Sequence, residues 1–310
     1  MRALSASWKV SLPCSRTEAE LLQEDISPFV EMESPPVLVT SEVGAAGPGS
    51  WQLDAYFEEK PGTAAIAQLR ALVPSAAGAD PAVEPVADAD WVTLSQQGLE
   101  PIHAGRFFVH TPAYRDAVPE DAVAFEIDAG LAFGTGQHET TTGCLMALDR
   151  LKATGASFSN ILDLGTGTGL LAFAGLKLWP AAKAAASDID PVAIEVAEEN
   201  AAVNGVRLGR TRGQLELLAA AGLDHPRLKL RAPYDLIVAN ILAGPLVALA
   251  PSVSAALAPG GWLILAGLLD RQAGGVAAAY RRESLTERFR IRRGDWPTLA
   301  MRKRRAVGRR

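Results

Sequence analysis

Three glycines follow an apolar run in the segment ILDLGTGTG, which spans Ile161–Gly169. Gly165, Gly167 and Gly169 have the spacing G-x-G-x-G, and glycine permits both a positive φ and a close approach of a ligand to the backbone. In an open α/β sheet such a loop lies at the carboxyl end of its strand, where ligands bind. The segment predicts a loop that binds a nucleoside-type ligand, and the alternative is a tight turn without a ligand.

A carboxylate ends the next apolar run, where Asp188 and Asp190 occur in ASDIDP. A carboxylate about 20 residues beyond the glycine loop can accept hydrogen bonds from both hydroxyls of a ribose. Pro191 suits the first helical position, so we expect Asp190 to cap that helix and Asp188 to bind the ribose. A solvated strand end is the alternative for Asp188.

A third run, YDLIVANILAGPL, places Asn240 directly after an apolar strand. Its side-chain amide should therefore lie at the same sheet edge as the glycine loop, where its carbonyl oxygen can accept an N–H bond from a substrate. A turn residue before the next helix is the alternative.

The segment DAGLAFGTGQHETTT, at Asp128–Thr142, contains three glycines around Phe133 and the hydroxyls of Thr140 and Thr141. Such a loop can fold over a bound ligand and exclude water. His138 is a candidate base, and a helix cap formed by a threonine explains the region equally well.

These segments require a sheet whose strands run in one direction. From residue 160 onward apolar strands alternate with helices, which predicts an α/β fold with a doubly wound, Rossmann-like parallel sheet. Two strand-like runs near the C-terminus, joined by Gly294–Pro297, predict an antiparallel hairpin. The expected elements are strands at Ile161–Leu164, Ala184–Asp188, Asp235–Ala239, Trp262–Leu265, Arg288–Arg293 and Thr298–Lys303, and helices at Leu170–Leu178, Val192–Asn204 and Pro245–Leu257. Residues 206–232 match no pattern that identifies an element or an adenine contact.

The first hundred residues predict a separate, small α+β domain. Its order, β-α-β-β-α-β, is that of ferredoxin-like domains. The expected strands are Trp8–Leu12, Pro36–Glu42, Ser50–Phe57 and one within 82–92, and the expected helices are Thr17–Asp25 and Pro61–Leu72. We therefore divide the chain into a domain at 1–95, a linker at 96–117 and a second domain at 118–310, and expect a fragment beginning near Val118 to fold alone.

Composition excludes several classes of protein. Of the 310 residues, 48% are hydrophobic and 21% charged, as in globular rather than disordered chains. Two cysteines, Cys14 and Cys144, exclude a disulfide framework and a Cys-rich zinc site, and we expect no metal. The absence of a long apolar run and of a signal-peptide core predicts a cytoplasmic protein without a membrane span. The net charge of −5 argues against general nucleic-acid binding.

Taken together, the four segments resemble the PrmA family of ribosomal protein methyltransferases, which modify protein eleven of the large subunit. The family's loop reads close to D-P-G-L-A-F-G-T-G-T-H-P-T-T, from which this chain departs at Ala129, Gln137 and Glu139. The glycine segment resembles the methyltransferase motif, with Thr166 where Cys is common. The resemblance covers roughly residues 90 to 270.

The resemblance implies an enzyme that uses S-adenosylmethionine to methylate the α-amine and lysine ε-amines of that ribosomal protein. It implies that Thr141, Gly165, Gly167, Gly169, Asp188 and Asn240 contact the cofactor or line its pocket, and Asn240 would also orient the amine. It further implies that the N-terminal domain recognises the protein substrate. The basic end MRKRRAVGRR is then either a solvated tail or a weak contact to ribosomal RNA.

Three other functions stay open at this point. The enzyme could methylate a glutamine of another protein, or a nucleic-acid or small-molecule amine. Asn240 is not followed by the Pro-Pro-aromatic run typical of amide and base methyltransferases, which counts against this alternative. An oxidoreductase with a nicotinamide cofactor is disfavoured by the glycine spacing. A binding module that retains a cofactor pocket without catalysis is disfavoured by the presence of Asp188 and Asn240.

Overall fold

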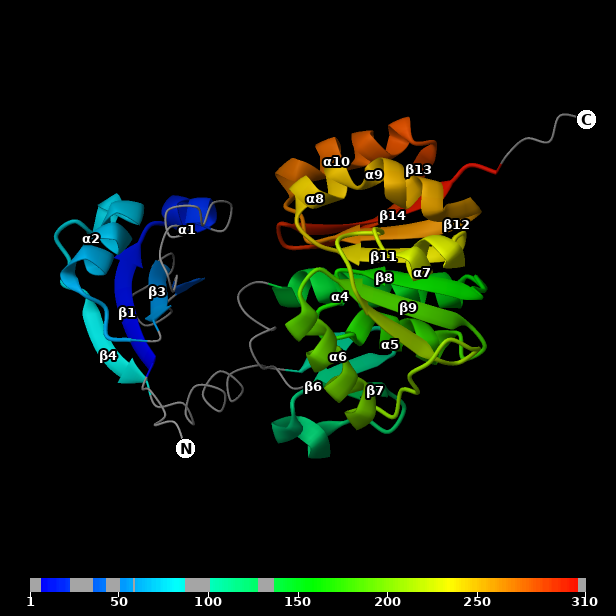
Figure 1. Ribbon diagram of the computed structural model, residues 1–310, viewed down its shortest axis with the longest axis horizontal. Coiled ribbons are helices and arrows are strands. Elements are labelled where there is room, and N and C mark those ends of the chain that lie inside the picture. Colours follow the sequence, from blue (N-terminus) through cyan, green and yellow to red (C-terminus); the bar gives the residue numbers. More distant parts are fainter. Residues whose placement is uncertain are drawn as a thin grey trace, which may run out of the picture. The chain divides into compact units, whose positions relative to one another are not determined.

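The computed structural model describes residues 7–22, 36–42, 51–57, 59–86, 101–127 and 137–305. The chain divides into two compact units, Met1–Gly98 and Leu99–Arg310, which Figure 1 shows coloured along the sequence.

The first unit is a four-stranded antiparallel sheet with two helices. The sheet has the order β2-β3-β1-β4. Its elements are β1 (Ser7–Cys14), α1 (Arg16–Leu22), β2 (Val37–Glu42), β3 (Trp51–Phe57), α2 (Thr63–Leu72), the 3-10 turn η3 (Pro74–Ala76) and β4 (Ala82–Val86). Both helices bury residues in one core with the sheet, with Ala19 and Leu69 packed among Val10 and Leu53. The ferredoxin-like prediction is confirmed, and residues 23–25 of the first expected helix lie outside the described residues.

The second unit contains a seven-stranded sheet of order β10-β9-β8-β11-β12-β14-β13. Neighbours among the first five strands are parallel, and β14 is antiparallel to both β12 and β13. The strands are β8 (Asn160–Leu164), β9 (Lys183–Asp188), β10 (Leu215–Ala219), β11 (Tyr234–Asn240), β12 (Leu257–Ala266), β13 (Leu285–Arg293) and β14 (Trp296–Lys303). The predicted Rossmann-like sheet and its antiparallel hairpin are confirmed.

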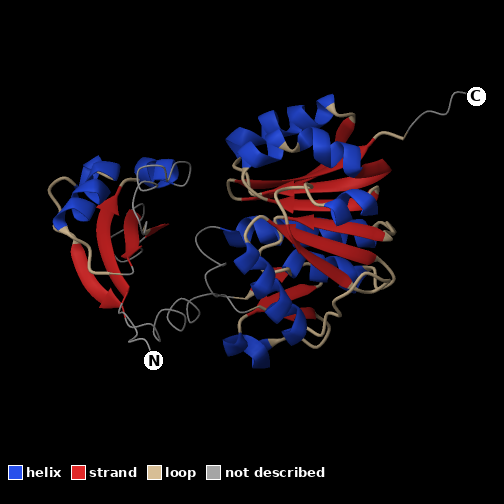
Figure 2. Cartoon of the chain, in the orientation of Figure 1, coloured by secondary structure: helices blue, strands red, loops and turns tan. Residues whose placement is uncertain are grey.

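Helices cover both faces of this sheet, as Figure 2 shows. They are α4 (Gln137–Ala153), α5 (Leu170–Leu178), α6 (Pro191–Val203), α7 (Pro226–Arg231), α8 (Ala243–Ala248), α9 (Ala250–Ala256) and α10 (Asp270–Arg282). Successive side chains of a strand point to opposite faces, so neighbouring residues of β8 enter different cores. Ile161 packs with Phe173 and Leu145, whereas Leu162 packs with Leu246. Burial of both faces explains why these strands are continuous apolar runs.

Several elements differ from the sequence prediction. Helices α4 and α10, and strand β10 with helix α7 inside residues 206–232, were not expected. The helix expected at Pro245–Leu257 is two helices, α8 and α9, which meet at Leu249. Pro251 has no backbone N–H to continue the first helix, so it begins a new one.

The predicted linker at 96–117 is wrong from residue 102 onward. Strands β5 (Ile102–Ala104) and β6 (Phe107–His110) form a three-stranded sheet with β7 (Val123–Glu126), and η4 (Pro112–Ala117) connects them. Ile102 and Phe107 are buried in the core of the second unit beside Leu148. The prediction failed because these strands are short and the turn at Gly105 breaks their alternation.

Candidate cofactor and amine site

The turn between β8 and α5 has the left-handed backbone that its glycines predict. Gly165, Gly167 and Gly169 have φ values of 71°, 51° and 85°, a region that side chains with a Cβ rarely adopt. Gly165 also makes a close contact, because an added Cβ there would lie 2.2 Å from Cγ2 of Ile241. The turn is therefore held against the loop that follows Asn240.

Asp188 is joined directly to the glycine turn. Its Oδ2 accepts a hydrogen bond of 2.9 Å from the N–H of Gly167, and its Oδ1 accepts one of 3.1 Å from the N–H of Asp190. A Cβ added at Gly167 would meet no atom within 4 Å, so the turn faces open space beside the carboxylate. The structure thus places Asp188, the residue predicted to bind the ribose, beside the predicted glycine loop.

Asp190 has the capping role that its position predicts. Its side chain accepts a hydrogen bond of 2.9 Å from the N–H of Val192, and Pro191 occupies the first turn of α6. Because this carboxylate is used as the cap, Asp188 is the residue of the pair that faces the glycine turn.

Asn240 ends β11 and meets the first turns of α4. Its amide nitrogen lies 3.4 Å from Oγ1 of Thr141, to which it donates a hydrogen bond. Thr141 is 9% exposed. The donation uses one of the two N–H groups of the amide and orients the side chain, whose carbonyl oxygen remains an acceptor. The structure therefore brings the predicted Thr141 and Asn240 together.

The loop expected to cover the ligand lies mostly beyond what the structure describes. Residues 128–136, including Phe133 and the three glycines, are outside the described ranges, and nothing is described of the His138 side chain. The described part of this segment is the start of helix α4, and Thr140 and Thr141 lie in the first turns of that helix. Both threonines are buried.

A buried carboxylate beneath the glycine turn escaped the sequence reasoning. Asp163, the next-to-last residue of β8, is 1% exposed, and its Oδ2 accepts bonds from Oγ1 of Thr166 (2.6 Å) and the N–H of Ala172 (3.1 Å). Burial raises the pKa of this carboxyl to about 6, and the charge of Asp188 acts in the same direction. An aspartate inside an otherwise apolar strand was the signal that could have found it.

Strand β10, which the sequence analysis did not predict, pairs with β9 and lies on the other side of Asp188 from the glycine turn. The N–H of Ala220, just past the strand, donates a bond of 2.7 Å to the carbonyl of Asp188. Ile189, the neighbour of Asp188, is 75% exposed. An exposed, large apolar side chain beside a ribose ligand suits the flat face of a nucleobase.

An ion pair ties the start of α4 to the C-terminal hairpin. Nε of Arg293, at the end of β13, lies 2.8 Å from Oε2 of Glu139 in the first turn of α4. The two residues are 154 positions apart, and Glu139 is one of the departures from the family's loop pattern. The hairpin therefore contacts the helix that carries Thr141.

Comparison with known proteins agrees with this geometry. The family model described as "Ribosomal protein L11 methyltransferase (PrmA)" matches residues 18–304. The chain is 48% identical over 216 residues to a ribosomal protein L11 methyltransferase of Brucella suis, covering 70% of this chain and 73% of that one. It is 46% identical over 221 residues to the protein of the same name from Agrobacterium fabrum, covering 71% and 73% of the two chains.

Among solved structures, the chain is similar to a ribosomal protein L11 methylase from Lactobacillus delbrueckii subsp. bulgaricus. The two are 30% identical with a TM-score of 0.56, and the match covers 66% of this chain and 98% of that one.

Proposed function

The chain belongs to the ribosomal protein L11 methyltransferase family, and we propose that it methylates the N-terminal α-amine and lysine ε-amines of ribosomal protein L11. It is an S-adenosylmethionine-dependent methyltransferase that acts on protein.

The observation that carries the proposal is one shared sheet edge. The glycine turn, Asp188 and Asn240 follow the carboxyl ends of three neighbouring parallel strands, β8, β9 and β11. Ligands of doubly wound sheets bind at this edge. A nucleoside and an amine can therefore meet above β8.

The residues present fit the cofactor. The backbone at Gly167 faces open space, and the carboxylate of Asp188 lies beside it for the ribose hydroxyls. We propose that Ile189 covers the adenine, and that Thr141 and Asn240 line the side where the methyl donor ends. When bound, S-adenosylmethionine supplies an electrophilic methyl group on a sulfonium cation.

The amine must be neutral to attack, and we propose that desolvation and the sulfonium cation of the bound cofactor favour that form. A free lysine has a pKa of about 10.4, so converting its ammonium group to the neutral amine at pH 7 costs about 4–5 kcal/mol. Desolvation and a nearby cation both lower such a pKa. Asn240, whose carbonyl oxygen is left as an acceptor, can bind an amine N–H and aim the lone pair along the line of displacement.

Asn240 can accept an N–H bond from the amine only during the first two methyl transfers. A monomethylated amine still has an N–H to donate, whereas a neutral dimethylated amine has none. We propose that the last methyl transfer depends on the shape of the pocket instead.

The remaining parts of the proposal concern the partner. We propose that the first unit recognises the ribosomal protein, since an open antiparallel sheet offers edges for strand pairing. We also propose a weak contact of the basic end, residues 302–310, with ribosomal RNA, and a cytoplasmic location. No helix in the part of the chain that the structure describes is long and apolar enough to cross a membrane.

Methyl transfer from labelled S-adenosylmethionine to purified L11 tests the function. Intact-mass and peptide measurements would count the methyl groups and locate them, with L11 blocked at its α-amine as the comparison. We expect labelled L11 with methyl groups on both kinds of amine. Transfer to an unrelated lysine-rich protein at the same rate would contradict the proposed substrate.

A further inference from the structure

Basic side chains are concentrated at one end of the sequence. Residues 281–310 hold 12 of the 30 Lys and Arg residues and 3 of the 35 Asp and Glu residues. The rest of the chain is therefore strongly acidic, and the overall charge of −5 conceals a large separation of charge. Such a separation predicts a polyanionic partner for this segment.

The fold brings part of this charge to the amino edge of the parallel sheet, which is the edge formed by the amino ends of its strands. Arg281 and Arg282 end α10, and Arg304 and Arg305 follow the end of β14. A hydrogen bond of 3.1 Å from the N–H of Arg304 to the carbonyl of Ser284 joins the two segments. Because this bond is formed by the backbone, the arginine side chains remain available.

Arg302 and Arg305 are placed by contacts with β12. Nε of Arg302 donates a bond of 3.0 Å to the carbonyl of Gly260, and its guanidinium lies 5.4 Å from the centre of the Trp262 ring. The side chain of Arg305 passes over Gly260, at which an added Cβ would lie 3.2 Å from it. The start of this basic end is thus part of the folded unit rather than a free tail. We call Arg281, Arg282, Arg302, Arg304 and Arg305 the amino-edge surface.

In the described part of the chain, the arginines of the amino-edge surface lack the acidic partners that Arg290, Arg292 and Arg293 of β13 have. Arg290 and Arg292 pair with Asp270, and Arg293 pairs with Glu139. Among the described residues, no carboxylate forms an ion pair with any arginine of the amino-edge surface. Arg281, Arg282, Arg304 and Arg305 are also exposed. These four exposed arginines therefore bring uncompensated positive charge to the amino edge of the sheet.

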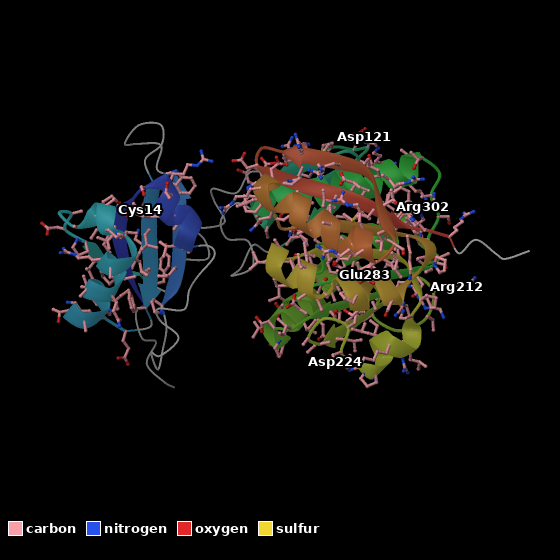
Figure 3. All side chains as sticks on the ribbon, turned by 90° about the horizontal axis from the view of Figure 1, so that it is seen from above. Cys14, Asp121, Arg212, Asp224, Glu283 and Arg302 are labelled. Atoms are coloured by element: carbon pink, nitrogen blue, oxygen red, sulfur yellow. The ribbon has the colours of Figure 1, made fainter. Side chains whose placement is uncertain are left out.

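More basic residues follow the same edge toward β10. Arg210 and Arg212 are exposed in the loop before that strand, and Figure 3 shows Arg212 and Arg302 at the same end of the unit. Two carboxylates near this edge already have partners. Glu216 pairs with Arg231, and Asp235 accepts the N–H bonds of Ser159 and Asn160.

We infer that the amino-edge surface binds the phosphodiester backbone of RNA. All five of its members are arginines, whose planar guanidinium binds phosphate with two hydrogen bonds and stacks on bases. The glycine turn and Asn240 lie at the opposite, carboxyl ends of the strands. Bound RNA would therefore leave the amine site open. That the RNA is ribosomal rests on the proposed function, because a ribosomal protein meets that RNA on assembly.

Fluorescence anisotropy with a labelled RNA hairpin tests the inference on the full-length protein. We expect the variants Arg281→Ala/Arg282→Ala and Arg304→Ala/Arg305→Ala each to bind about tenfold more weakly than the unsubstituted chain at low salt. The slope of log affinity against log salt should fall by about 0.7–0.9 for each phosphate contact removed. The matched control, Lys177→Ala/Arg271→Ala, removes two charges elsewhere and should change affinity less than twofold.

Three outcomes would overturn the inference. They are unchanged RNA binding by both variants, an equal loss in the control, and equally effective competition by an acidic peptide of the same charge, which would indicate an acidic protein partner. Methylation of free L11 by the same variants should keep its rate, so a failure of RNA binding is distinguishable from a failure of the proposed function.

Discussion

The side-chain amide of Asn240 donates a hydrogen bond to the hydroxyl of Thr141, although the two residues are 99 positions apart. One belongs to the end of a parallel strand and the other to the start of the helix that precedes the sheet. The bond orients the amide, whose carbonyl oxygen remains available to accept a hydrogen bond from a substrate.

This relationship predicts different effects for the two partners. Asn240→Ala should lower kcat at least tenfold, about 1.4 kcal/mol in the barrier, because the amine loses its acceptor. Thr141→Val keeps the shape but removes the acceptor for the amide, and should lower kcat less. Steady-state kinetics with L11, together with calorimetry of cofactor binding, measures both. A loss of cofactor affinity without a loss of kcat would assign Asn240 to cofactor binding alone.

Asp188 should control cofactor affinity. Asp188→Ala removes a charged acceptor and the partner of the Gly167 N–H, and we expect cofactor binding to weaken by about 1.5–3 kcal/mol. Asp190→Ala is the matched control, since it removes the cap of α6 and should cost about 1 kcal/mol of stability with little change in affinity. Isothermal calorimetry and chemical denaturation separate the two effects, and equal affinity losses would contradict our assignment of the pair.

The ion pair between Glu139 and Arg293 should couple the hairpin to the start of α4. Both side chains are more than two-fifths exposed, so a double-mutant cycle with alanine should give a coupling of only about 0.2–1 kcal/mol, reduced by salt. The exchanged variant, Glu139→Arg with Arg293→Glu, should regain part of the stability that either single charge reversal loses. No coupling at low salt would show that the contact does not hold the helix.

Asp163 should make stability depend on pH. Its folded-state pKa of about 6 lies above the ordinary value, so the folded protein binds this proton more tightly than the unfolded chain. The stabilisation is present in acid and is lost as pH rises through about 6. One unit of pKa shift corresponds to about 1.4 kcal/mol. The difference in unfolding free energy between Asp163→Asn and the unsubstituted chain should therefore move in favour of the variant by about 2–3 kcal/mol as the pH rises from 4 to 7.5. Denaturation at several pH values measures this difference, and a difference that does not vary with pH would contradict it.

The boundary of the catalytic unit can be tested by truncation. A fragment beginning at Leu99 keeps Ile102 and Phe107 in the core and should fold and bind S-adenosylmethionine. A fragment beginning at Val118 loses both, and loss of a single buried phenylalanine side chain already costs about 3–5 kcal/mol. We therefore expect the shorter fragment to be unstable, which circular dichroism during heating would measure. The longer fragment should methylate L11 poorly if the first unit recognises the substrate.

Local patterns in the sequence were sufficient for the class of fold and for most of the site. The apolar run before Gly165 indicated a strand, the glycines a left-handed turn, and the position of Asp188 a carboxylate at the next strand end. Each of these inferences depends on residues that are neighbours in the chain, and the direction of parallel strands then places them at one edge.

Tertiary structure alone decided which distant groups meet. The sequence contains no signal that Thr141 would bond Asn240, that Glu139 would pair with Arg293, or that Arg304 would lie beside the end of α10. Such contacts depend on how the strands are ordered in the sheet and how the helices pack on it. The short strands β5 and β6 were missed for the same reason. They are short and interrupted by the turn at Gly105, and burial of Ile102 and Phe107 in the core that includes α4 holds them in place.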